Sequence, residues 1–328
     1  MLASSGNMAD TKPVVGILSI GEMGLGIANL LVNHGYQVVT FAEDRSKRTR
    51  DRAKSINISL LPSITDLVTQ STAILSIVPP KDSFATAKRI HEATPKEPRH
   101  SPLYYLDLNA TSPSLAKETS TLLSSTKNII YIDGGIIGGP PSVISNSTGT
   151  TVTWTKPSLV TSGPDKLPPT AVYQDLASTL NIEHISDTIG SASGTKLCFA
   201  STTKGFFAIA IQAFVTAEKM GVTQDFRRYM QRHNSATLNI AEKGVVGMPS
   251  KAWRWVDEMR MIGECMAEEG GFGRELFDEV AEVYRVVAED TALGQEQVEN
   301  RQRGKTVDDV VSVMCEGMDA TRKKEKAE

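Results

Sequence analysis

Cysteine is scarce in this chain of 328 residues, which has three thiols, at positions 198, 265 and 315. They form no CxxC pair and have no neighbouring histidine, and none of the five histidines has a partner at metal-ligand spacing. An odd, widely spaced set of thiols excludes a disulfide framework and a structural zinc site, and it fits a reducing compartment. We therefore expect no metal site and a cytoplasmic location. The first twelve residues lack the apolar core of a secretory signal, and residues 1–11 are expected to be disordered.

The sequence also lacks an excess of positive charge and a long apolar run. Lysine and arginine number 35 against 38 acidic residues, which gives a formal net charge of −3. Without surplus basic residues to follow a phosphate backbone, nucleic-acid binding is not expected. The longest mainly apolar stretch, 205–215, is well short of the roughly 20 residues that a membrane helix needs. No membrane span is therefore expected.

The first half of the chain alternates between short apolar runs and amphipathic stretches. Strands are expected at 14–20, 37–41, 58–61, 72–78, 103–108 and 128–132. Helices are expected at 25–33, 45–54 and 113–124, the last with Ser112 as its N-cap and Pro113 in its first turn. Strands separated by helices at this spacing predict βαβ units and a parallel sheet that is buried on both faces.

The pattern changes after residue 150. Paired strands at 150–155 and 158–163, and a helix near 173–180, are expected to extend the same sheet. Residues 191–220 form one long helical stretch, and helical spacing of apolar residues continues at 253–266 and 274–288. The predicted fold is α/β, a doubly wound parallel Rossmann-type sheet at 12–190. An all-helical C-terminal domain for substrate and dimerisation follows at 191–328, entered through the long interdomain helix.

The first strand leads into a degenerate form of the dinucleotide-binding turn GxGxxG. Its three glycines serve a tight turn, close approach of the backbone to a pyrophosphate, and close helix–strand packing. Ser19 stands in the first place and Gly21 and Gly24 in the others, with Glu22 and Met23 between them. The helix that follows offers unpaired N–H groups to an anion. We expect these five residues to bind a dinucleotide; the alternative is that the glycines only shape the turn.

About twenty residues after this turn, where a ribose-reading acid is expected, the chain reads EDRSKRTR from residue 43 to residue 50. Glu43 and Asp44 would favour NAD by accepting hydrogen bonds from a 2′-hydroxyl. Arg45 and Ser46, with the arginines that follow, would instead bind a 2′-phosphate. Because several basic groups follow the strand directly, we expect NADP, with NAD as the alternative. The alternative is that these basic residues bind no ligand and form the solvent-exposed face of a helix.

Several segments, in this order, carry a family resemblance: IGEMG at 20–24, VPP at 78–80, DLNATSP at 107–113, DGGIIGG at 133–139 and GSASGTK at 190–196. Together they resemble the β-hydroxyacid dehydrogenase family, which includes 3-hydroxyisobutyrate and 6-phosphogluconate dehydrogenases. KAWRW at 251–255 and AEVY at 281–284 resemble a C-terminal helical domain of unknown function found in one branch of these proteins. The resemblance spans nearly the whole chain.

The resemblance implies the positions of further site residues. It implies cofactor contacts for Val78, Pro79 and Asn109, and substrate contacts for Asn109, Ser112, Gly138 and Gly139. The chain departs from the family where a substrate-binding serine is common, because Ile137 stands there, and where an asparagine is common, because Ala200 stands there. Two polar contacts typical of small hydroxy-acid substrates are therefore missing.

The resemblance also assigns Lys196 as the catalytic lysine at the start of the interdomain helix. Oxidation of a hydroxyl by hydride transfer needs a group that takes the proton, and the reverse reaction needs a group that gives one. A free lysine is a poor base at neutral pH, so this role requires surroundings that disfavour the ammonium form. The alternative is a lysine that reaches solvent. Lys204 lies about 80° further around the helix, and we assign it to the substrate, with an outward position as the alternative.

The resulting expectation is an NADP-dependent oxidoreductase that transfers a hydride between nicotinamide and a small hydroxy- or keto-acid-like substrate. One alternative is an imine or bulky-ketone reductase of the same fold, favoured by Ile137 and opposed by Lys196. Another is an NADP-binding sensor without turnover, suggested by the two missing polar contacts. Family analogy and the apolar long helix predict a homodimer.

Overall fold

The computed structural model describes residues 11–41, 47–144, 152–296 and 301–326. The chain divides into two compact units, residues 1–196 and 197–328. Residues 1–10 of the segment expected to be disordered lie outside the described residues, as do Arg45 and Ser46.

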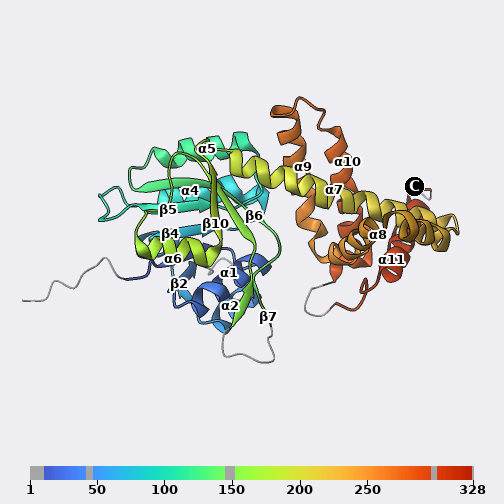
Figure 1. The fold of residues 1–328 in the computed structure, drawn as a ribbon, viewed down its shortest axis with the longest axis horizontal. Helices are drawn as coiled ribbons and strands as arrows, with labels where there is room; N and C mark the ends of the chain where they lie inside the picture. The colour runs from blue at the N-terminus through green and yellow to red at the C-terminus, as the bar shows by residue number, and fades with distance from the viewer. Residues whose placement is uncertain (1–10, 42–46, 145–151, 297–300, 327–328) are drawn as a thin grey trace, which may run out of the picture. The chain divides into compact units, whose positions relative to one another are not determined.

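Eight strands form the main sheet of the first unit, in the order β10-β9-β6-β5-β4-β1-β2-β3 (Figure 1). They are β1 (Val15–Leu18), β2 (Val38–Phe41), β3 (Ser59–Leu61), β4 (Ala73–Ser76), β5 (Leu103–Asp107), β6 (Ile129–Ile137), β9 (Ser158–Ser162) and β10 (Ile182–Ser186). From β3 to β6 all neighbours are parallel, whereas β9 is antiparallel to β6 and parallel to β10. The α/β prediction is confirmed, with a sheet that is mostly parallel.

Helices cover both faces of this sheet (Figure 1). Those of the first unit are α1 (Glu22–Asn33), α2 (Lys47–Ser55), α3 (Ile64–Gln70), α4 (Ser83–Ala93), α5 (Pro113–Ser124) and α6 (Ala171–Leu180), with a 3-10 helix at Pro80–Asp82. One buried cluster joins the sheet to α1 and α6 through residues such as Ile27 and Leu176, and a second joins it to α3, α4 and α5 through residues such as Ile90. Each such buried side chain contributes about 1.5–3 kcal/mol.

Local sequence signals explain where the helices begin and end. Ser112 caps α5 by accepting a hydrogen bond from the backbone N–H of Leu115 at 3.3 Å, and Pro113 occupies the first turn, as predicted. Helix α1 ends at Asn33, and the backbone of Gly35 adopts φ +76°, a left-handed conformation that favours glycine.

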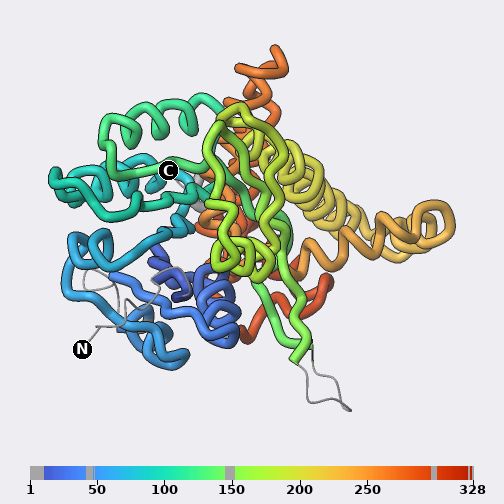
Figure 2. The backbone as a smooth tube through the Cα atoms, turned by 60° about the vertical axis from the view of Figure 1, so that its left-hand side comes forward, coloured from blue at the N-terminus to red at the C-terminus, as the bar shows by residue number. Residues whose placement is uncertain are grey.

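Two details of the sheet differ from the prediction. Strand β6 continues five residues past Ile132, because the second half of this strand pairs antiparallel with β9. The predicted pairing of 150–155 with 158–163 is wrong. Strand β8 (Thr153–Thr155) pairs instead with β7 (Ser142–Ile144) in a separate two-stranded sheet, which extends away from the main sheet (Figure 2).

The second unit is helical. Helix α7 (Ser191–Lys219) begins in the first unit and continues into the second, where it is followed by α8 (Thr223–Gly247), α9 (Ala252–Glu268), α10 (Glu275–Glu289) and α11 (Val307–Glu325), with 3-10 helices at Pro249–Lys251 and Ala292–Gln295. The described residues beyond position 190 form no strand. Aromatic rings pack inside this unit. The ring of Trp255 lies edge-on to that of Tyr284, with 5.2 Å between the ring centroids, and stacks on that of Phe207, with 6.4 Å between the centroids.

Helix α7 is long and apolar enough to cross a membrane by length and composition alone, with a mean hydropathy of 1.3 over 18 residues. Of that window, 39% is buried within the protein. The core helix of a globular protein has the same character. The mainly apolar stretch at 205–215 is therefore only part of a longer apolar segment of this helix. The absence of a membrane span stays a prediction.

Candidate functional site in the first unit

The carboxyl ends of four parallel strands lie in one row. Leu18 of β1 is in register with Ser76 of β4, Ser76 with Asp107 of β5, and Asp107 with Asp133 of β6. Neighbouring strands lie about 4.8 Å apart, so the segments that leave these strands emerge side by side. Open α/β sheets bind ligands at this edge.

The turn after β1 has the features of a phosphate cradle. Ser19 adopts φ +77°, a conformation that is rare for a residue with a side chain, so it makes the tight turn that the first glycine of the motif usually makes. A Cβ on Gly24 would stand 2.1 Å from the carbonyl oxygen of Ser19, so that this place admits glycine alone. Around Gly21, the N-cap of α1, the nearest atom to an added Cβ would be Ser19 Oγ at 3.8 Å.

The first turn of α1 supplies N–H groups to this cradle. The first intrahelical bond runs from the N–H of Leu25 to the carbonyl of Gly21 at 2.9 Å, so the N–H groups of Glu22, Met23 and Gly24 precede the helical ladder. Such donors at a helix N-terminus suit an anionic pyrophosphate. The geometry of the turn therefore fits a dinucleotide, and the contacts predicted for Ser19, Gly21, Glu22, Met23 and Gly24 stay a prediction.

Helix α2 follows β2, where the ribose-reading segment is expected. Arg45 and Ser46 lie outside the described residues, so their predicted contacts are not described. The helix itself reads KRTRDRAKS, with basic residues at five of its nine positions. It therefore presents a strongly basic sequence at the position where a 2′-phosphate group is expected.

Asn109 is buried, with 2% of its surface exposed, and its side chain ties the ends of β4 and β5 to the start of α4. Its Oδ1 accepts the backbone N–H of Val78 at 2.7 Å, and its amide group donates to Asp107 Oδ1 at 2.6 Å, Ser76 Oγ at 3.0 Å and Ser83 Oγ at 3.1 Å. The amide thus fixes the Val78 segment against β5. Its predicted direct contact with cofactor or substrate stays a prediction.

Asp107 and Asp133 are buried carboxylates that the sequence analysis did not assign. Each has 1–2% of its surface exposed, and they face each other in register on adjacent strands. Burial, followed by the charge of Asp133, raises the pKa of Asp107 to about 6, although hydrogen bonds from Asn109 and Ser83 oppose this shift. The sequence signal was present, because an aspartate directly follows the apolar run of each strand, in LYYLD and NIIYID.

Lys196 lies in the second turn of α7 and is half-buried. Its aliphatic stem lies against the backbone of Gly135, where a Cβ would stand 2.7 Å from the Cβ of Lys196 and 3.2 Å from its Cγ. The stem thus contacts β6 at Gly135, two residues beyond Asp133. This contact lies at the end of the sheet where the glycine turn follows β1.

The remaining residues assigned to the substrate lie at different places. Ser112 is buried at the N-terminus of α5, where its hydroxyl caps the helix and pairs with Ser114 at 2.9 Å. Gly138 and Gly139 follow β6 directly and are exposed, with Gly138 at φ +116°. Their backbone groups are therefore accessible beside the strand end that carries Gly135.

Lys204 lies within the second unit, and its ammonium pairs with the carboxylate of Glu258 and lies 5.0 Å from the ring centroid of Trp255. The hydroxyl of Tyr284 donates to the backbone carbonyl of Lys204. The lysine side chain is only 17% exposed and its glutamate partner 7%, so this buried pair fixes α7 to α9. Its assignment to the substrate stays a prediction.

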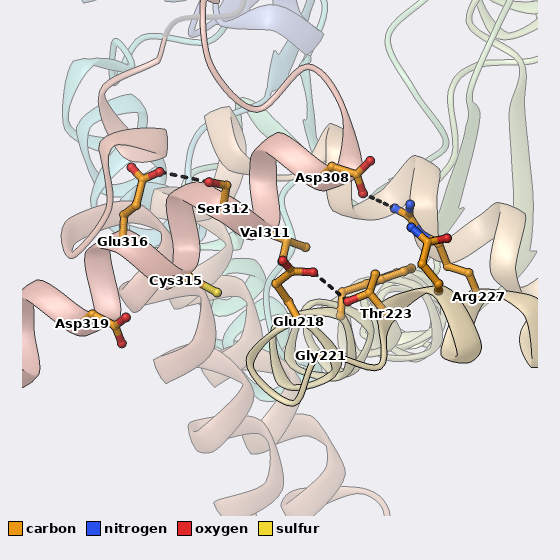
Figure 3. A pocket seen from close by; sticks show the side chains of 12 residues that line it. Glu218, Gly221, Thr223, Arg227, Asp308, Val311, Ser312, Cys315, Glu316 and Asp319 are labelled. Carbon is orange, nitrogen blue, oxygen red and sulfur yellow. Dashed lines mark hydrogen bonds and ion pairs between the residues drawn. The ribbon is translucent and has the colours of Figure 1, made fainter.

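The second unit contains a cavity of about 590 Å³ between the end of α7, the start of α8 and α11 (Figure 3). Four of its lining residues are acidic: Glu218, Asp308, Glu316 and Asp319. Arg227 pairs with Asp308 at 2.7 Å, and Ser312 donates to Glu316 at 3.0 Å. None of the predicted site residues lines this cavity. In the part of the chain that the structure describes, no cluster of three or more metal-binding side chains occurs.

Comparison with known proteins identifies both parts of the chain. Residues 14–151 match the NAD binding domain of 6-phosphogluconate dehydrogenase, and residues 217–287 match a domain of unknown function, DUF1932. The resemblance predicted from the motifs is confirmed at both ends of the chain.

Individual relatives are distant. An uncharacterised 28.5 kDa protein of Methanothermus fervidus is 22% identical over 236 residues, which is 71% of this chain and 82% of that protein. The structure of 3-hydroxyisobutyrate dehydrogenase from Mycobacterium tuberculosis superposes with a TM-score of 0.62 at 15% identity, covering 93% of this chain and 98% of that one. A reductive aminase from Aspergillus terreus, solved with NADPH4, cyclohexanone and allyl amine, superposes with a TM-score of 0.53 at 18% identity, covering 91% of this chain and 99% of that one. At these identities the structural likenesses show the fold alone.

Proposed function

We propose that this protein, whose first unit carries an NAD-binding domain of the 6-phosphogluconate dehydrogenase type, is an NADP-dependent oxidoreductase. It transfers a hydride between the nicotinamide and a small hydroxy- or keto-acid-like substrate, and Lys196 is the general acid/base.

The observation that carries the proposal is the common row of strand ends. The glycine turn follows Leu18, the Val78 segment follows Ser76, and Gly135, against which Lys196 packs, follows Asp133 by two residues. A cofactor whose pyrophosphate lies on the first of these segments extends along the same edge of the sheet. This order supports a nicotinamide position close to β6, against which the stem of Lys196 packs.

The chemistry divides between cofactor and protein. A nicotinamide bound at this edge supplies the acceptor or donor of the hydride. The Nζ of Lys196 takes the proton of the substrate hydroxyl during oxidation and returns it during reduction. The exposed backbone groups of Gly138 and Gly139 hold polar groups of the substrate. General acid/base catalysis of this kind contributes about 10²–10⁴-fold to a rate.

The preference for NADP rests on the basic sequence around the end of β2. Arg45 and Ser46 precede the basic helix α2, and a 2′-phosphate next to several cations gains charge-assisted hydrogen bonds. In this segment, the groups that could accept a hydrogen bond from the 2′-hydroxyl of NAD are the carboxylates of Glu43 and Asp44. We therefore assign NADP as the cofactor, and NAD as the weaker ligand.

A homodimer in the cytoplasm completes the proposal. Ile209 and Met220, in and directly after α7, are 58% and 67% exposed, which is unusual for large apolar side chains. A second copy of the chain would cover such residues. Light scattering of the purified protein measures the mass directly, and a monomer at micromolar concentration would contradict this part.

A second candidate function is imine or bulky-ketone reduction. Ile137 stands where the resemblance implies a substrate-binding serine, and the reductive aminase of Aspergillus terreus shares the fold. An apolar residue there suits a substrate without a carboxylate. Lys196 argues against this candidate, because the family resemblance implies this lysine for the dehydrogenases and not for the imine-reducing members.

One experiment tests both candidates. It measures the absorbance of reduced nicotinamide while the protein is incubated with a panel of candidate substrates, called probes here. The panel contains 2- and 3-hydroxy acids with NADP, and keto acids, bulky ketones and cyclic imines with NADPH. Turnover of a hydroxy acid or keto acid supports the main proposal, and exclusive turnover of imines or ketones supports the second. Tight NADPH binding without turnover of any probe would overturn both and favour a sensor.

A further inference from the structure

The buried carboxylate of Asp133 gathers the start of α7. Its Oδ2 accepts the backbone N–H groups of Gly190 at 2.9 Å, Ala192 at 3.2 Å and Ser193 at 3.3 Å, and the hydroxyl of Ser162 at 2.6 Å. Its Oδ1 accepts the hydroxyl of Ser193 at 2.5 Å. Both oxygens thus accept hydrogen bonds, and the aspartate is only 1% exposed.

These bonds satisfy N–H groups that a helix cannot satisfy itself. The first N–H groups of an α-helix have no intrahelical acceptor, and the N-terminus carries a partial positive charge. A carboxylate placed there is stabilised by both effects. Because Asp133 comes from the centre of the sheet rather than from the helix, it fixes the helix start to β6.

The spacing of β6 matches that of the first turns of α7. Asp133 and Gly135 lie on one face of the strand, about 6.7 Å apart, since side chains two residues apart share a face. Ala192 and Lys196 lie on one face of the helix, about 6 Å apart along its axis. Asp133 binds the N–H of Ala192, and Gly135 meets the stem of Lys196. The helix therefore lies along the strand at two points of contact.

We propose that Asp133 and Gly135 are positioning residues for Lys196. Asp133 holds the helix start in place, and Gly135 leaves room for the lysine stem next to the strand. The inference rests on the proposed function for its catalytic consequence, but the positioning itself is measurable without substrate. Neither residue touches a reacting atom in this account.

The experiment compares the wild-type chain with Asp133→Asn and Ser193→Ala. The first replaces one carboxylate oxygen by an NH2 group and removes the charge, and the second removes the hydroxyl that donates to Oδ1. Ser71→Ala is the matched control, because Ser71 is fully buried and its hydroxyl has no hydrogen-bond partner in the described structure. Thermal melting establishes that each variant is folded.

Four readouts are combined. Hydrogen–deuterium exchange reports the amides of 190–193, and mass spectrometry reports the acetylation rate of Lys196 by an N-hydroxysuccinimide ester. Steady-state kinetics with the turned-over probe separate kcat from the KM for NADPH, and a pH profile of kcat reports the lysine. Loss of charge-assisted hydrogen bonds is expected to speed exchange at 190–193 by about 10-fold or more.

The proposal predicts faster exchange at 190–193, a changed acetylation rate of Lys196, a lower kcat with a shifted pH profile, and an unchanged KM for NADPH. Ser71→Ala changes none of these. Unchanged exchange in both test variants, or faster exchange with unchanged acetylation of Lys196, would overturn the positioning role. If the wild type turns over no probe but exchange and acetylation change as expected, the positioning stands and the proposed function fails.

Discussion

The stem of Lys196 lies against the bare backbone of Gly135, where a Cβ would stand 2.7 Å from the Cβ of the lysine. Gly135→Ala must therefore displace the lysine or the strand. A misplacement of about 1 Å costs on the order of 10²-fold in rate, so we expect kcat to fall by about 10–100-fold while NADPH affinity stays within about twofold.

Gly247→Ala is the control for this change, because nothing lies within 4 Å of a Cβ added at that glycine. Steady-state kinetics and fluorescence titration of NADPH measure the two effects. A Gly135→Ala enzyme with wild-type kcat would show that the lysine stem can move without loss of turnover.

The glycine turn gives a second prediction. In Gly24→Ala the new Cβ would stand 2.1 Å from the carbonyl oxygen of Ser19, so the turn must open. Overpacking of this kind costs about 1–3 kcal/mol of unfolding free energy, and the displaced N–H groups lose their aim at the pyrophosphate. We expect a lower denaturation midpoint in urea and a marked loss of NADPH affinity by fluorescence titration. Undiminished NADPH binding would remove this turn from the cofactor site.

The buried pair of aspartates predicts a pH-dependent stability. Burial and the neighbouring charge of Asp133 raise the pKa of Asp107 to about 6 in the folded protein, above its ordinary value of 3.8. Between about pH 4 and pH 6 the folded state therefore holds a proton that the unfolded state has released. The free energy of unfolding falls as pH rises through this window, by up to about 3 kcal/mol.

The side chain in Asp107→Asn cannot ionise. The free energy of unfolding of this variant should therefore fall less steeply with rising pH than that of the wild type. Urea denaturation at several pH values between 4 and 7 measures the slope, with Glu118→Gln on the exposed face of α5 as control. An Asp107→Asn protein whose stability follows pH as steeply as the wild type would contradict the raised pKa.

Much of the first unit could be predicted from sequence because its signals are local. The buried strand at Leu103–Asp107 and the capped helix at Pro113–Ser124 depend on apolar runs and on Ser112. The end of β6 could not be predicted in this way. Gly134 and Gly135 look like a turn, but they continue the strand because β9 supplies an antiparallel partner. The partner lies more than twenty residues away and leaves no trace in the local pattern.

The site shows the same division. The glycine turn is a local motif, and its geometry follows from Ser19 and Gly24. The partners of Asp133 and Lys204 are distant in sequence. Asp133 accepts hydrogen bonds from Gly190 and Ser193, which follow it by 57 and 60 positions, and Lys204 pairs with Glu258. Only the tertiary fold brings these groups together. An apolar run followed directly by an aspartate is the one sequence signal that could have pointed to Asp133.

The basic segment after β2 predicts the cofactor preference. We expect NADPH to bind at least about 10-fold more tightly than NADH, because a 2′-phosphate gains charge-assisted bonds. Arg45→Ala should weaken NADPH binding and leave NADH binding unchanged. Lys88→Ala on α4, whose side chain is 61% exposed, is the control. Calorimetric titration of both nucleotides measures the preference, and tighter binding of NADH would reverse the assignment.

The most direct test of the account compares Lys196→Ala with the wild type in turnover of the probe and in NADPH affinity. Loss of the acid/base should lower kcat by about 10²–10⁴-fold and leave the dissociation constant of NADPH within about twofold. If Lys196→Ala keeps most of its turnover while Lys204→Ala loses it, Lys196 is not the acid/base and the central claim is wrong.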